Sequence, residues 1–316
     1  VMMKPLIILT GPTAVGKTEL SIALAKSVGG EVISADSMQV YKYMDIGTAK
    51  IRPWEMQGVP HHLIDILEPD EPFNVAVFKD LAKAAMEEIY DRGHIPIIVG
   101  GTGFYIQALL YDIDFTEEDS DASLRKELEE LALEKGGDYL HALLREVDPE
   151  SAEQIHANNV KRVIRALEYY RIHSQKISVH NAAEREKKSP YNFLYFVLSH
   201  DRKILYDRIE KRIDKMLEEG LISEVDNLIK KGYDSSLVSM QGLGYKELIP
   251  YLQEECSLEE AVYILKRDTR HFAKRQLTWF RRERDVRWLD KARFSSEEEI
   301  LKEILDTMNK EWSLLK

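Results

Sequence analysis

The chain has 316 residues, of which 44% are hydrophobic and 31% are charged, and its formal net charge is −11. These values are typical of a globular protein with one large domain or two smaller ones, and no apolar run approaches the roughly 20 residues that a transmembrane helix needs. The single cysteine, Cys256, excludes an internal disulfide, and the first residues lack the features of a signal peptide, so we expect a cytoplasmic protein with no membrane partner.

The first predicted elements are a strand, a glycine-rich loop and a helix. Residues 6–9 form a short apolar run typical of a buried strand, and Lys17–Val28 is predicted to be a helix that ends at two glycines. Between them the chain matches the phosphate-loop pattern G-x-x-x-x-G-K-[ST] in full. The loop residues are Gly11, Pro12, Thr13, Ala14, Val15, Gly16, Lys17 and Thr18.

This loop has the chemistry of a diphosphate site. Its backbone N–H groups surround the phosphates, the helix N-terminus adds a partial positive charge, and the ammonium group of Lys17 adds a full one. The hydroxyl group of Thr18 is placed to bind Mg²⁺. The sequence therefore predicts a P-loop that holds a diphosphate, with Mg²⁺ as the cofactor.

A second strand, predicted at residues 31–34, delivers Asp36 just past its carboxyl end. Ligands of open α/β sheets bind at that edge, where a carboxylate within reach of the phosphates could accept a proton from an attacking nucleophile. Asp36 followed by Ser37 is also good capping chemistry for a helix or turn. The spacing alone leaves both interpretations open.

A third strand at residues 95–99 follows a helix that Asn74 is expected to cap, and it runs into a Gly-Gly-Thr-Gly sequence containing Thr102. Glycines let the backbone approach a phosphate, and the Thr102 hydroxyl could bond a bridging oxygen; a plain strand-to-helix turn is the alternative. This strand ends without the acidic residue that usually helps a P-loop enzyme hold Mg²⁺ with ATP or GTP. An ATPase is therefore not favoured.

The strand signals disappear between residues 114 and 189, where we expect three or four polar helices. A strand at residues 193–198 follows, and from Asp201 the pattern is helical to the end. Strands that alternate with helices predict an α/β fold: a P-loop NTPase-like parallel sheet covered by helices, with an all-helical insertion domain. The predicted domains are residues 1–113 plus 190–316 for the catalytic core and 114–189 for the insertion.

Basic residues are concentrated in three places despite the acidic net charge. From Lys266 to Arg287 nine basic residues face three acidic ones, which makes this stretch about +6. A helix predicted from Asp201 carries a basic face, and the insertion carries a second basic stripe. The residues are Arg208, Arg212 and Lys215 in the former and Lys161, Arg162, Arg165 and Arg171 in the latter. This segregation favours a polyanion as the partner.

Two adjacent histidines, His61 and His62, are the remaining candidates for metal ligands. Neighbouring residues on a strand point to opposite faces, and no cysteine or further histidine accompanies them. We do not expect them to form a metal pair.

Taken together, these segments resemble the bacterial tRNA dimethylallyltransferase family, also called isopentenyl-diphosphate:tRNA transferases. The matching stretches are residues 11–18, 36–41, 100–105, 158–168, 201–216, 241–247 and 269–281, in the family's order. One segment departs from the family pattern: His-Pro-Asn-Asp-x-Gln-Arg is replaced here by the sequence from His156 to Arg162. That departure concerns the contacts that push the base out, not the reaction.

The resemblance implies that the P-loop binds dimethylallyl diphosphate and that the acceptor is N6 of the adenosine that follows the anticodon of tRNA. In the family, Asp36 corresponds to the general base, Thr102 to the residue that bonds the bridging oxygen, and Arg208 to an arginine that contacts phosphate with Lys17. The helical insertion corresponds to the part that holds the anticodon stem-loop. The tRNA contacts that it implies are Ser37, Met38, Gln39, Arg125, Lys161, Arg162, Arg165, Lys274 and Arg275.

Three alternatives remain open at this stage. A P-loop kinase of a small metabolite or nucleotide would use Asp36 as the base for its acceptor, and a related transferase of free adenine nucleotides would keep the core without needing the insertion. A nucleotide-gated RNA-binding protein would bind ATP or GTP and form no prenyl product. A cleft complete within one chain favours a monomer.

Overall fold

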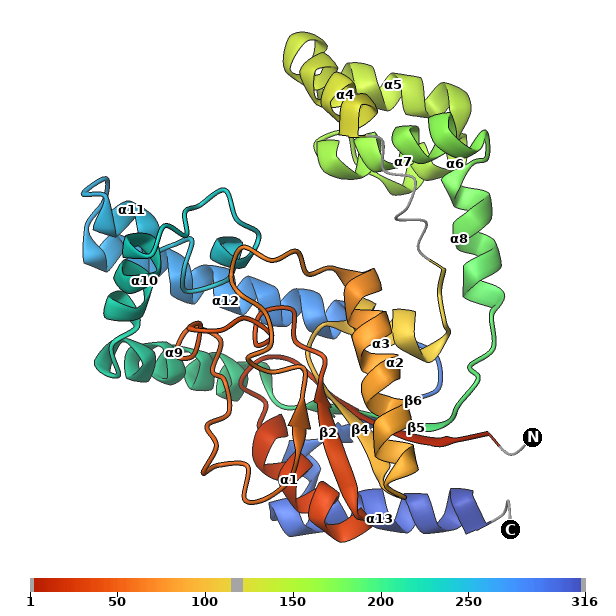
Figure 1. Ribbon diagram of the computed structural model, residues 1–316, viewed down its shortest axis with the longest axis vertical. Helices are drawn as coiled ribbons and strands as arrows, with labels where there is room; N and C mark the ends of the chain where they lie inside the picture. Colours follow the sequence, from red (N-terminus) through yellow and green to blue (C-terminus); the bar gives the residue numbers. More distant parts are fainter. Residues whose placement is uncertain (1–2, 115–121, 314–316) are drawn as a thin grey trace. The chain divides into compact units, whose positions relative to one another are not determined.

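The computed structural model describes residues 3–114 and 122–313 and contains one six-stranded sheet (Figure 1). The strands lie in the order β3-β2-β4-β1-β5-β6, and every adjacent pair is parallel. Their bounds are Pro5–Thr10 for β1, Gly30–Ser34 for β2, His61–His62 for β3, Ile95–Gly100 for β4, Asn192–Ser199 for β5 and Val286–Asp290 for β6. The predicted parallel α/β fold is confirmed.

The central strands are apolar on both faces because helices cover both. In β1, residues 6–9 are all at most 1% exposed, as expected for a strand of a parallel sheet. The crossovers from β1 to β2 and from β3 to β4 run in opposite directions along the sheet, so right-handed connections put their helices on opposite faces. Helices α1 (Lys17–Val28) and α2 (Val75–Asp91) pack against the sheet, and α13 (Glu297–Ser313) packs against α1; α3 (Gly103–Leu110) follows β4.

The remaining helices of this part of the chain follow β5. Their bounds are Arg202–Glu218 for α9, Leu221–Lys230 for α10, Ile249–Leu252 for α11 and Leu258–Phe280 for α12, with short 3-10 helices η1 at Ser239–Gln241 and η2 at Lys291–Arg293. The expected helix starts are present. Asn74 accepts a hydrogen bond from the backbone N–H of Val77, and the Ser257 hydroxyl accepts one from that of Glu260.

Residues 110–190 form a compact unit separate from the one made by residues 1–109 and 191–316. Its helices are α4 (Ala122–Lys135), α5 (Gly137–Val147), α6 (Pro149–Gln154), α7 (Val160–His173) and α8 (Ile177–Glu186). Its described residues thus contain five helices rather than three or four, because the six-residue α6 is too short to show a helical period. The predicted insertion, 114–189, includes residues 115–121, which lie outside the described part of the chain.

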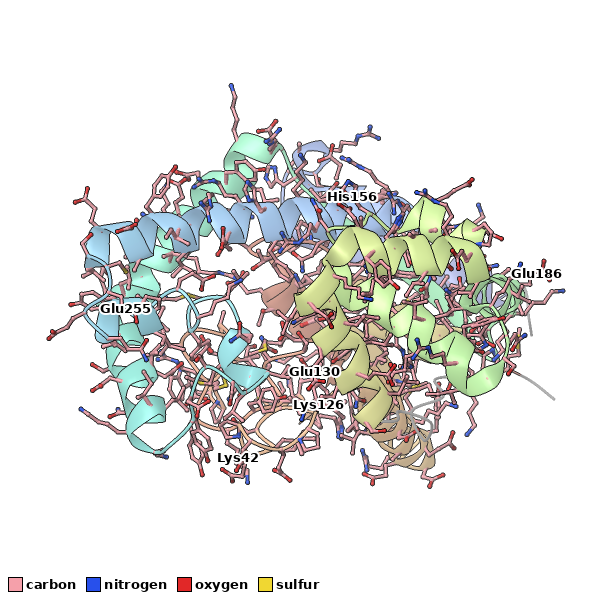
Figure 2. All side chains as sticks on the ribbon, turned by 90° about the horizontal axis from the view of Figure 1, so that it is seen from above. Lys42, Lys126, Glu130, His156, Glu186 and Glu255 are labelled. Carbon is pink, nitrogen blue, oxygen red and sulfur yellow. The ribbon has the colours of Figure 1, made fainter. Side chains whose placement is uncertain are left out.

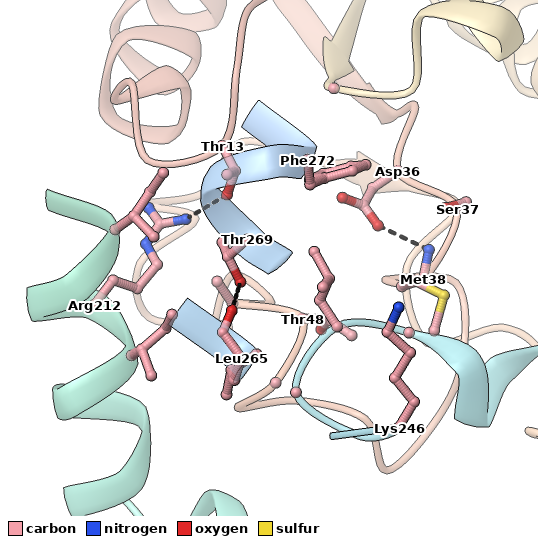
Figure 3. Close-up of a pocket in the computed structure, with 18 of the residues that line it drawn as sticks. Thr13, Asp36, Ser37, Met38, Thr48, Arg212, Lys246, Leu265, Thr269 and Phe272 are labelled. Atoms are coloured by element: carbon pink, nitrogen blue, oxygen red, sulfur yellow. Dashed lines mark hydrogen bonds between the residues drawn. The ribbon is translucent and has the colours of Figure 1, made fainter. Parts of the chain in front are cut away.

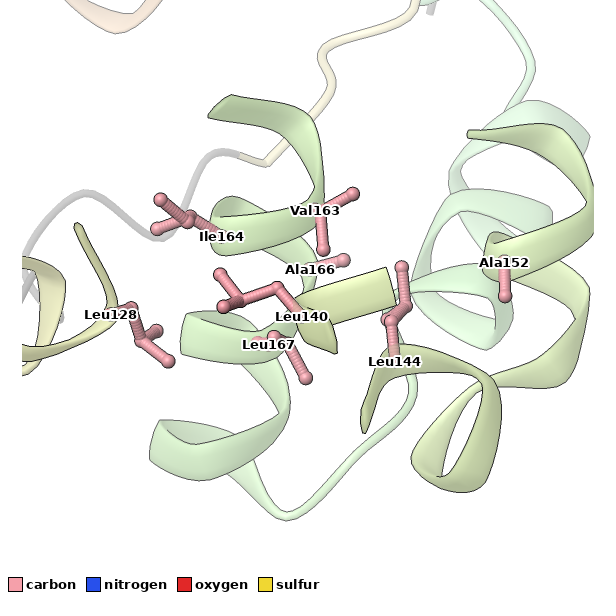
Figure 4. Packing of buried hydrophobic residues seen from close by; sticks show 8 residues of the cluster. All are labelled: Leu128, Leu140, Leu144, Ala152, Val163, Ile164, Ala166 and Leu167. Carbon is pink, nitrogen blue, oxygen red and sulfur yellow. The ribbon is translucent and has the colours of Figure 1, made fainter. Parts of the chain in front are cut away.

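A small apolar core holds the helical unit together (Figure 4). Leu140 and Leu144 of α5 pack with Val163 and Leu167 of α7, and Leu128 of α4 joins them; all five are at most 4% exposed. The outer surface of α4 is charged instead. Figure 2 shows Lys126 and Glu130 one helical turn apart, with 3.9 Å between their charged groups. This arrangement is an ordinary amphipathic bundle.

The prediction that the chain is helical from Asp201 to the end was wrong, because β6 adds a sixth strand beside β5. The pattern is weak since β6 is a five-residue edge strand in which only Leu289 is buried, whereas Arg287 and Trp288 are exposed. Because β6 is parallel to β1, the segment that follows it lies at the carboxyl ends of the strands, as the phosphate loop does. Among the described residues, no helix is long and apolar enough to cross a membrane.

Candidate active site

The phosphate loop connects the carboxyl end of β1 to α1, as the motif requires. Gly16, with a φ of 94°, precedes the first residue of α1 in a left-handed conformation that glycine adopts without strain. The ammonium group of Lys17 folds back and donates hydrogen bonds of 2.9 Å to the carbonyl oxygens of both Gly11 and Pro12. The loop therefore carries its cation at the helix N-terminus, where an anion binds best.

Two arginines of α9 approach the same loop. Arg208 donates to the carbonyl oxygen of Val15 and Arg212 to the hydroxyl oxygen of Thr13, each over 3.5 Å. Among the described residues, neither arginine nor Lys17 forms an ion pair with a carboxylate. Burial, reinforced by the charge of Arg212, lowers the pKa of Lys17 to about 7, and burial also lowers the pKa of Arg212. An anion would relieve this accumulation of positive charge.

Asp36 lies one strand away, past the end of β2. Its Oδ1 atom accepts hydrogen bonds from the backbone N–H groups of Met38, at 2.8 Å, and Gln39, at 3.2 Å. No described residue donates to Oδ2. Burial raises the pKa of Asp36, although these two hydrogen bonds and the charge of Lys17 oppose the rise. The two interpretations of Asp36 are thus compatible, because one oxygen closes a turn and the other is available to accept a proton.

Thr102 follows β4, the strand that lies between β2 and β1. Its backbone N–H donates to the carbonyl oxygen of Ala35, which ties the end of β4 to the segment that carries Asp36. The preceding Gly101 allows a close approach, because a Cβ atom there would lie 2.2 Å from the side-chain nitrogen of Gln276. Gln276, on α12, donates to Gly101 and accepts from the backbone N–H of Thr13. It therefore connects the two loops.

Thr13, Asp36, Thr102, Arg212 and Gln276 line a pocket of about 420 Å³ (Figure 3). Thr13 and Arg212 lie at one end, and the carboxylate of Asp36 points inward from the adjacent wall. Much of the remaining lining is apolar and comes from α9, α12, the segment around η1 and the turn after β2. The apolar side chains are Met38, Ile209, Ile213, Met216, Val238, Leu243, Leu265 and Phe272. The pocket thus combines Arg212 at one end with an apolar wall, and its lining includes two further cations, Arg275 and Lys246.

Of the predicted tRNA contacts outside the helical unit, some line the pocket and others do not. Ser37, Met38 and Arg275 line the pocket, and Lys274 is exposed on α12 next to Arg275. The side chain of Gln39 does not line the pocket; it bonds the Ser34 hydroxyl and the carbonyl oxygen of Thr48. Gln39 thereby fixes the loop that forms one wall.

In the helical unit, Arg125 of α4 and Arg165 of α7 share one carboxylate. Oε2 of Glu168 accepts a hydrogen bond from Arg125 over 2.9 Å and one from Arg165 over 3.4 Å. The Glu168 side chain is fully buried and its Oε1 atom has no partner, whereas both arginines are about 40% exposed. Lys161 and Arg162, in the first turn of α7, are exposed to solvent. Of the four predicted tRNA contacts in this unit, Arg125 and Arg165 are thus held in place by a buried carboxylate, whereas Lys161 and Arg162 are not.

The basic stretch from Lys266 to Arg287 is less positive than its sequence indicates. Lys266 pairs with Asp214 and Arg270 with Glu210, both on α9, at 2.6 and 2.7 Å. These ion pairs fasten α12 to α9 and neutralise part of the stretch. Lys266 and Arg270 are therefore not available to a ligand as unpaired cations.

Sequence reasoning missed three residues of the site. Arg212 was visible only as part of a basic helix face, and Gln276 had no distinguishing pattern. Lys291, in η2, donates to the carbonyl oxygen of Val15 over 3.2 Å. Its position depends on β6, which was not predicted, so no sequence signal could have found it.

The loop could hold Mg²⁺ through Thr18. No described residue offers the Thr18 hydroxyl a hydrogen bond, and hydroxyl oxygen is a ligand that Mg²⁺ accepts. The described residues contain no group of three or more His, Cys, Asp or Glu side chains suited to a metal, so most ligands would come from phosphate oxygens and water. His61 bonds the carbonyl oxygen of Val59, and His62 bonds Glu31.

Known proteins are similar to this chain over most of its length. The family model described as IPP transferase matches residues 39–283, and one described as Isopentenyl transferase matches residues 4–67. The tRNA dimethylallyltransferase of Lachnoclostridium phytofermentans is 64% identical over 303 residues, which are 96% of this chain and 97% of that protein.

Solved structures show the same likeness over nearly the whole chain. The tRNA isopentenylpyrophosphate transferase of Staphylococcus epidermidis is 46% identical with a TM-score of 0.72, and the match covers 97% of this chain and 99% of that one. A eukaryotic dimethylallyltransferase acting on tRNA is 32% identical with a TM-score of 0.77, over 91% of this chain and 74% of that one.

Proposed function

The chain belongs to the IPP transferase family, and we propose that it transfers the dimethylallyl group of dimethylallyl diphosphate to N6 of the adenosine on the 3′ side of the anticodon in tRNA. Its reaction is the prenylation of tRNA, and diphosphate is the leaving group. The anticodon stem-loop is the partner that we assign to the helical unit.

The observation that carries this proposal is the composition of the pocket beside the phosphate loop. Thr13 of the phosphate loop and Arg212 lie at one end, apolar side chains that include Ile213 and Phe272 line another part, and the Asp36 carboxylate points into the pocket. A diphosphate ester of a short branched hydrocarbon has this distribution of charge and apolar surface. A metabolite kinase would need a polar acceptor pocket in place of the apolar wall.

The chemistry follows from these positions. An adenine amine is a weak nucleophile, so the allylic carbon must develop positive charge as its bond to the diphosphate oxygen breaks. Lys17, Arg208 and the loop N–H groups stabilise the charge that collects on the leaving diphosphate. Thr102 bonds the bridging oxygen, and Oδ2 of Asp36 takes the N6 proton as the C–N bond forms. The raised pKa of Asp36 makes it a stronger base than an ordinary aspartate.

Mg²⁺ belongs to this proposal as the partner of the diphosphate. The Thr18 hydroxyl would hold the ion beside the phosphates, and the bound ion would neutralise phosphate charge. Asp201, the acid nearest the end of β5, caps α9, since its Oδ1 atom accepts hydrogen bonds from the N–H groups of Lys203 and Ile204. No acidic residue directly follows β4, where a P-loop ATPase would carry its second aspartate, and this supports a donor other than ATP.

The acceptor base must leave its stack to react, since a stacked adenine cannot bring N6 to Asp36. Ser37, Met38 and Arg275 line the pocket where the base would enter. Because the pocket is complete within one chain, we expect a monomer. We assign its action to the cytoplasm, where one unpaired cysteine, Cys256, is stable as a thiol.

The test is incubation with Mg²⁺, labelled dimethylallyl diphosphate and an anticodon stem-loop that carries adenosine at the acceptor position, followed by nucleoside mass analysis. We expect one dimethylallyl group on N6 of that adenosine, and none when guanosine replaces it. Stem-loop binding without transfer, together with tight ATP binding, would favour the RNA-binding alternative. Transfer of phosphate from ATP to a small acceptor would favour the kinase.

A further inference from the structure

Lys291 reaches the phosphate loop from a part of the chain that no phosphate-binding motif includes. It lies in η2, directly after β6, and its side chain is only 7% exposed. Its ammonium group donates to the carbonyl oxygen of Val15 over 3.2 Å and forms an ion pair with Glu297 in the first turn of α13. A buried lysine from the C-terminal part of the chain, already paired with a carboxylate, is therefore packed against the phosphate loop.

Lys291 shares its acceptor in the phosphate loop with Arg208, which we assign to the diphosphate. The carbonyl oxygen of Val15 also accepts from Arg208. A Cβ atom built on Gly16 would lie 2.8 Å from Nζ of Lys291 and 4.0 Å from the Arg208 guanidinium. Lys291 and Arg208 thus converge on Val15 and Gly16, the two residues that precede α1 in the phosphate loop.

The ion pair with Glu297 is incompletely satisfied. An ammonium group has three N–H donors, and Lys291 uses two of them, on Val15 and Glu297. The Oε2 atom of Glu297 is buried without a hydrogen-bond partner. Desolvation makes a partly buried ion pair costly unless its geometry is complete. A diphosphate at the loop would offer Lys291 a more highly charged partner.

We propose that Lys291 is a further diphosphate-binding residue, and that Glu297 holds it beside the loop until the donor binds. On binding, the ammonium group moves from Glu297 to a phosphate oxygen; no covalent bond changes and the lysine stays protonated. The proposal rests on the proposed function, because it takes the donor to be an organic diphosphate. It adds to the motif a cation that β6 and α13 position.

The test is calorimetric titration of the full chain with dimethylallyl diphosphate and Mg²⁺ in the absence of tRNA. We expect Lys291→Met to raise the Kd of the donor about tenfold or more, as for loss of one charge-assisted hydrogen bond, and Lys291→Arg to recover most of the affinity. Glu297→Gln removes the competing carboxylate and should lower that Kd severalfold. The matched control is Lys302→Met, which removes an exposed lysine of α13 that pairs with Asp306.

The variants separate this proposal from a structural role. If Lys291 only fastens α13 to the sheet, Lys291→Met and Glu297→Gln will weaken donor binding together and lower the melting temperature equally, which overturns the proposal. Unchanged affinity in Lys291→Met also overturns it. If the unaltered protein binds no dimethylallyl diphosphate, the proposed function itself fails. Stem-loop affinity measured without donor should be unchanged in all four variants.

Discussion

The two parts of the molecule treat their positive charges in opposite ways. In the phosphate loop, Lys17, Arg208 and Arg212 donate to carbonyl and hydroxyl oxygens, and none forms an ion pair with a carboxylate of the described chain. In the helical unit, Arg125 and Arg165 share the buried Glu168. The first arrangement accumulates charge that a ligand must neutralise, whereas the second fixes the direction of two guanidinium groups and neutralises half of their charge.

This difference matches two kinds of polyanion. A diphosphate is small and highly charged, so its site benefits from cations that lack internal partners and gain a partner only from the ligand. An RNA backbone is extended, and its contacts must have the correct spacing as well as charge. We infer that the core is organised for charge stabilisation and the helical unit for alignment.

The largest effect should come from Asp36→Asn. This substitution tests whether the Asp36 carboxylate acts as a base or only as a counter-ion for nearby cations, as Glu168 does in the helical unit. A base that removes the N6 proton contributes to the rate, so we expect transfer to fall about 10²- to 10⁴-fold while the Kd of the donor changes little. The measurement is single-turnover transfer alongside donor titration. A changed donor affinity with normal turnover would make Asp36 a counter-ion instead of a base.

The pH dependence of donor binding isolates the core cations. Because the pKa of Lys17 is lowered to about 7 in the empty site and a bound diphosphate would raise it, the complex binds an extra proton above pH 7. Donor affinity should therefore be highest below about pH 7 and fall up to about tenfold per pH unit above it. Calorimetry in buffers of different ionisation enthalpy measures the proton uptake.

The control for this measurement is Lys17→Arg, whose guanidinium stays charged throughout the range. Ionisation of the diphosphate itself is common to both proteins, so the difference between them reports Lys17. An equal pH dependence in the two would mean that Lys17 is already fully charged in the empty site.

Glu168→Gln tests alignment against charge in the helical unit. The substitution adds one positive charge to the surface but loosens Arg125 and Arg165, and we expect stem-loop affinity to fall about tenfold with donor affinity unchanged. Filter binding at several salt concentrations measures it. Tighter binding would show that net charge, and not the direction of the guanidinium groups, determines the affinity.

How much of the site the sequence could predict depended on how far apart its residues lie in the chain. The loop from Gly11 to Thr18 was recognisable because its chemistry needs a fixed local spacing, and Asp36 because a short strand separates it from the loop's helix. The contact of Gln276 with Gly101 spans 175 residues, and the apolar wall combines α9, α12 and the segment around η1. No local pattern encodes such contacts, because packing alone brings them together.

The same reasoning explains the missing strand. The central strands β1 and β5 are uniformly apolar since both of their faces are covered, and they were predicted near their observed positions. At the sheet edge, β6 has only one neighbour and needs few buried side chains, so its sequence resembles a charged loop. Lys291 was lost with it, although its position relative to the phosphate loop is as well defined as that of Arg208.

The smallest predicted effect concerns Lys161 and Arg162, two exposed cations in the first turn of α7 that no buried carboxylate holds. If each contacts one RNA phosphate, replacing both with alanine removes two released counterions, and the slope of log K against log salt should become shallower by about 1.4 to 1.8. At physiological salt the affinity should fall only severalfold, because mobile side chains lose conformational entropy when they bind.

Exposed Lys126 and Lys135 on α4, replaced in the same way, provide a control of equal charge. A slope that changes equally in both double variants would mean that the RNA senses the charge of the whole unit, whereas a change confined to Lys161 and Arg162 would place the backbone along the start of α7.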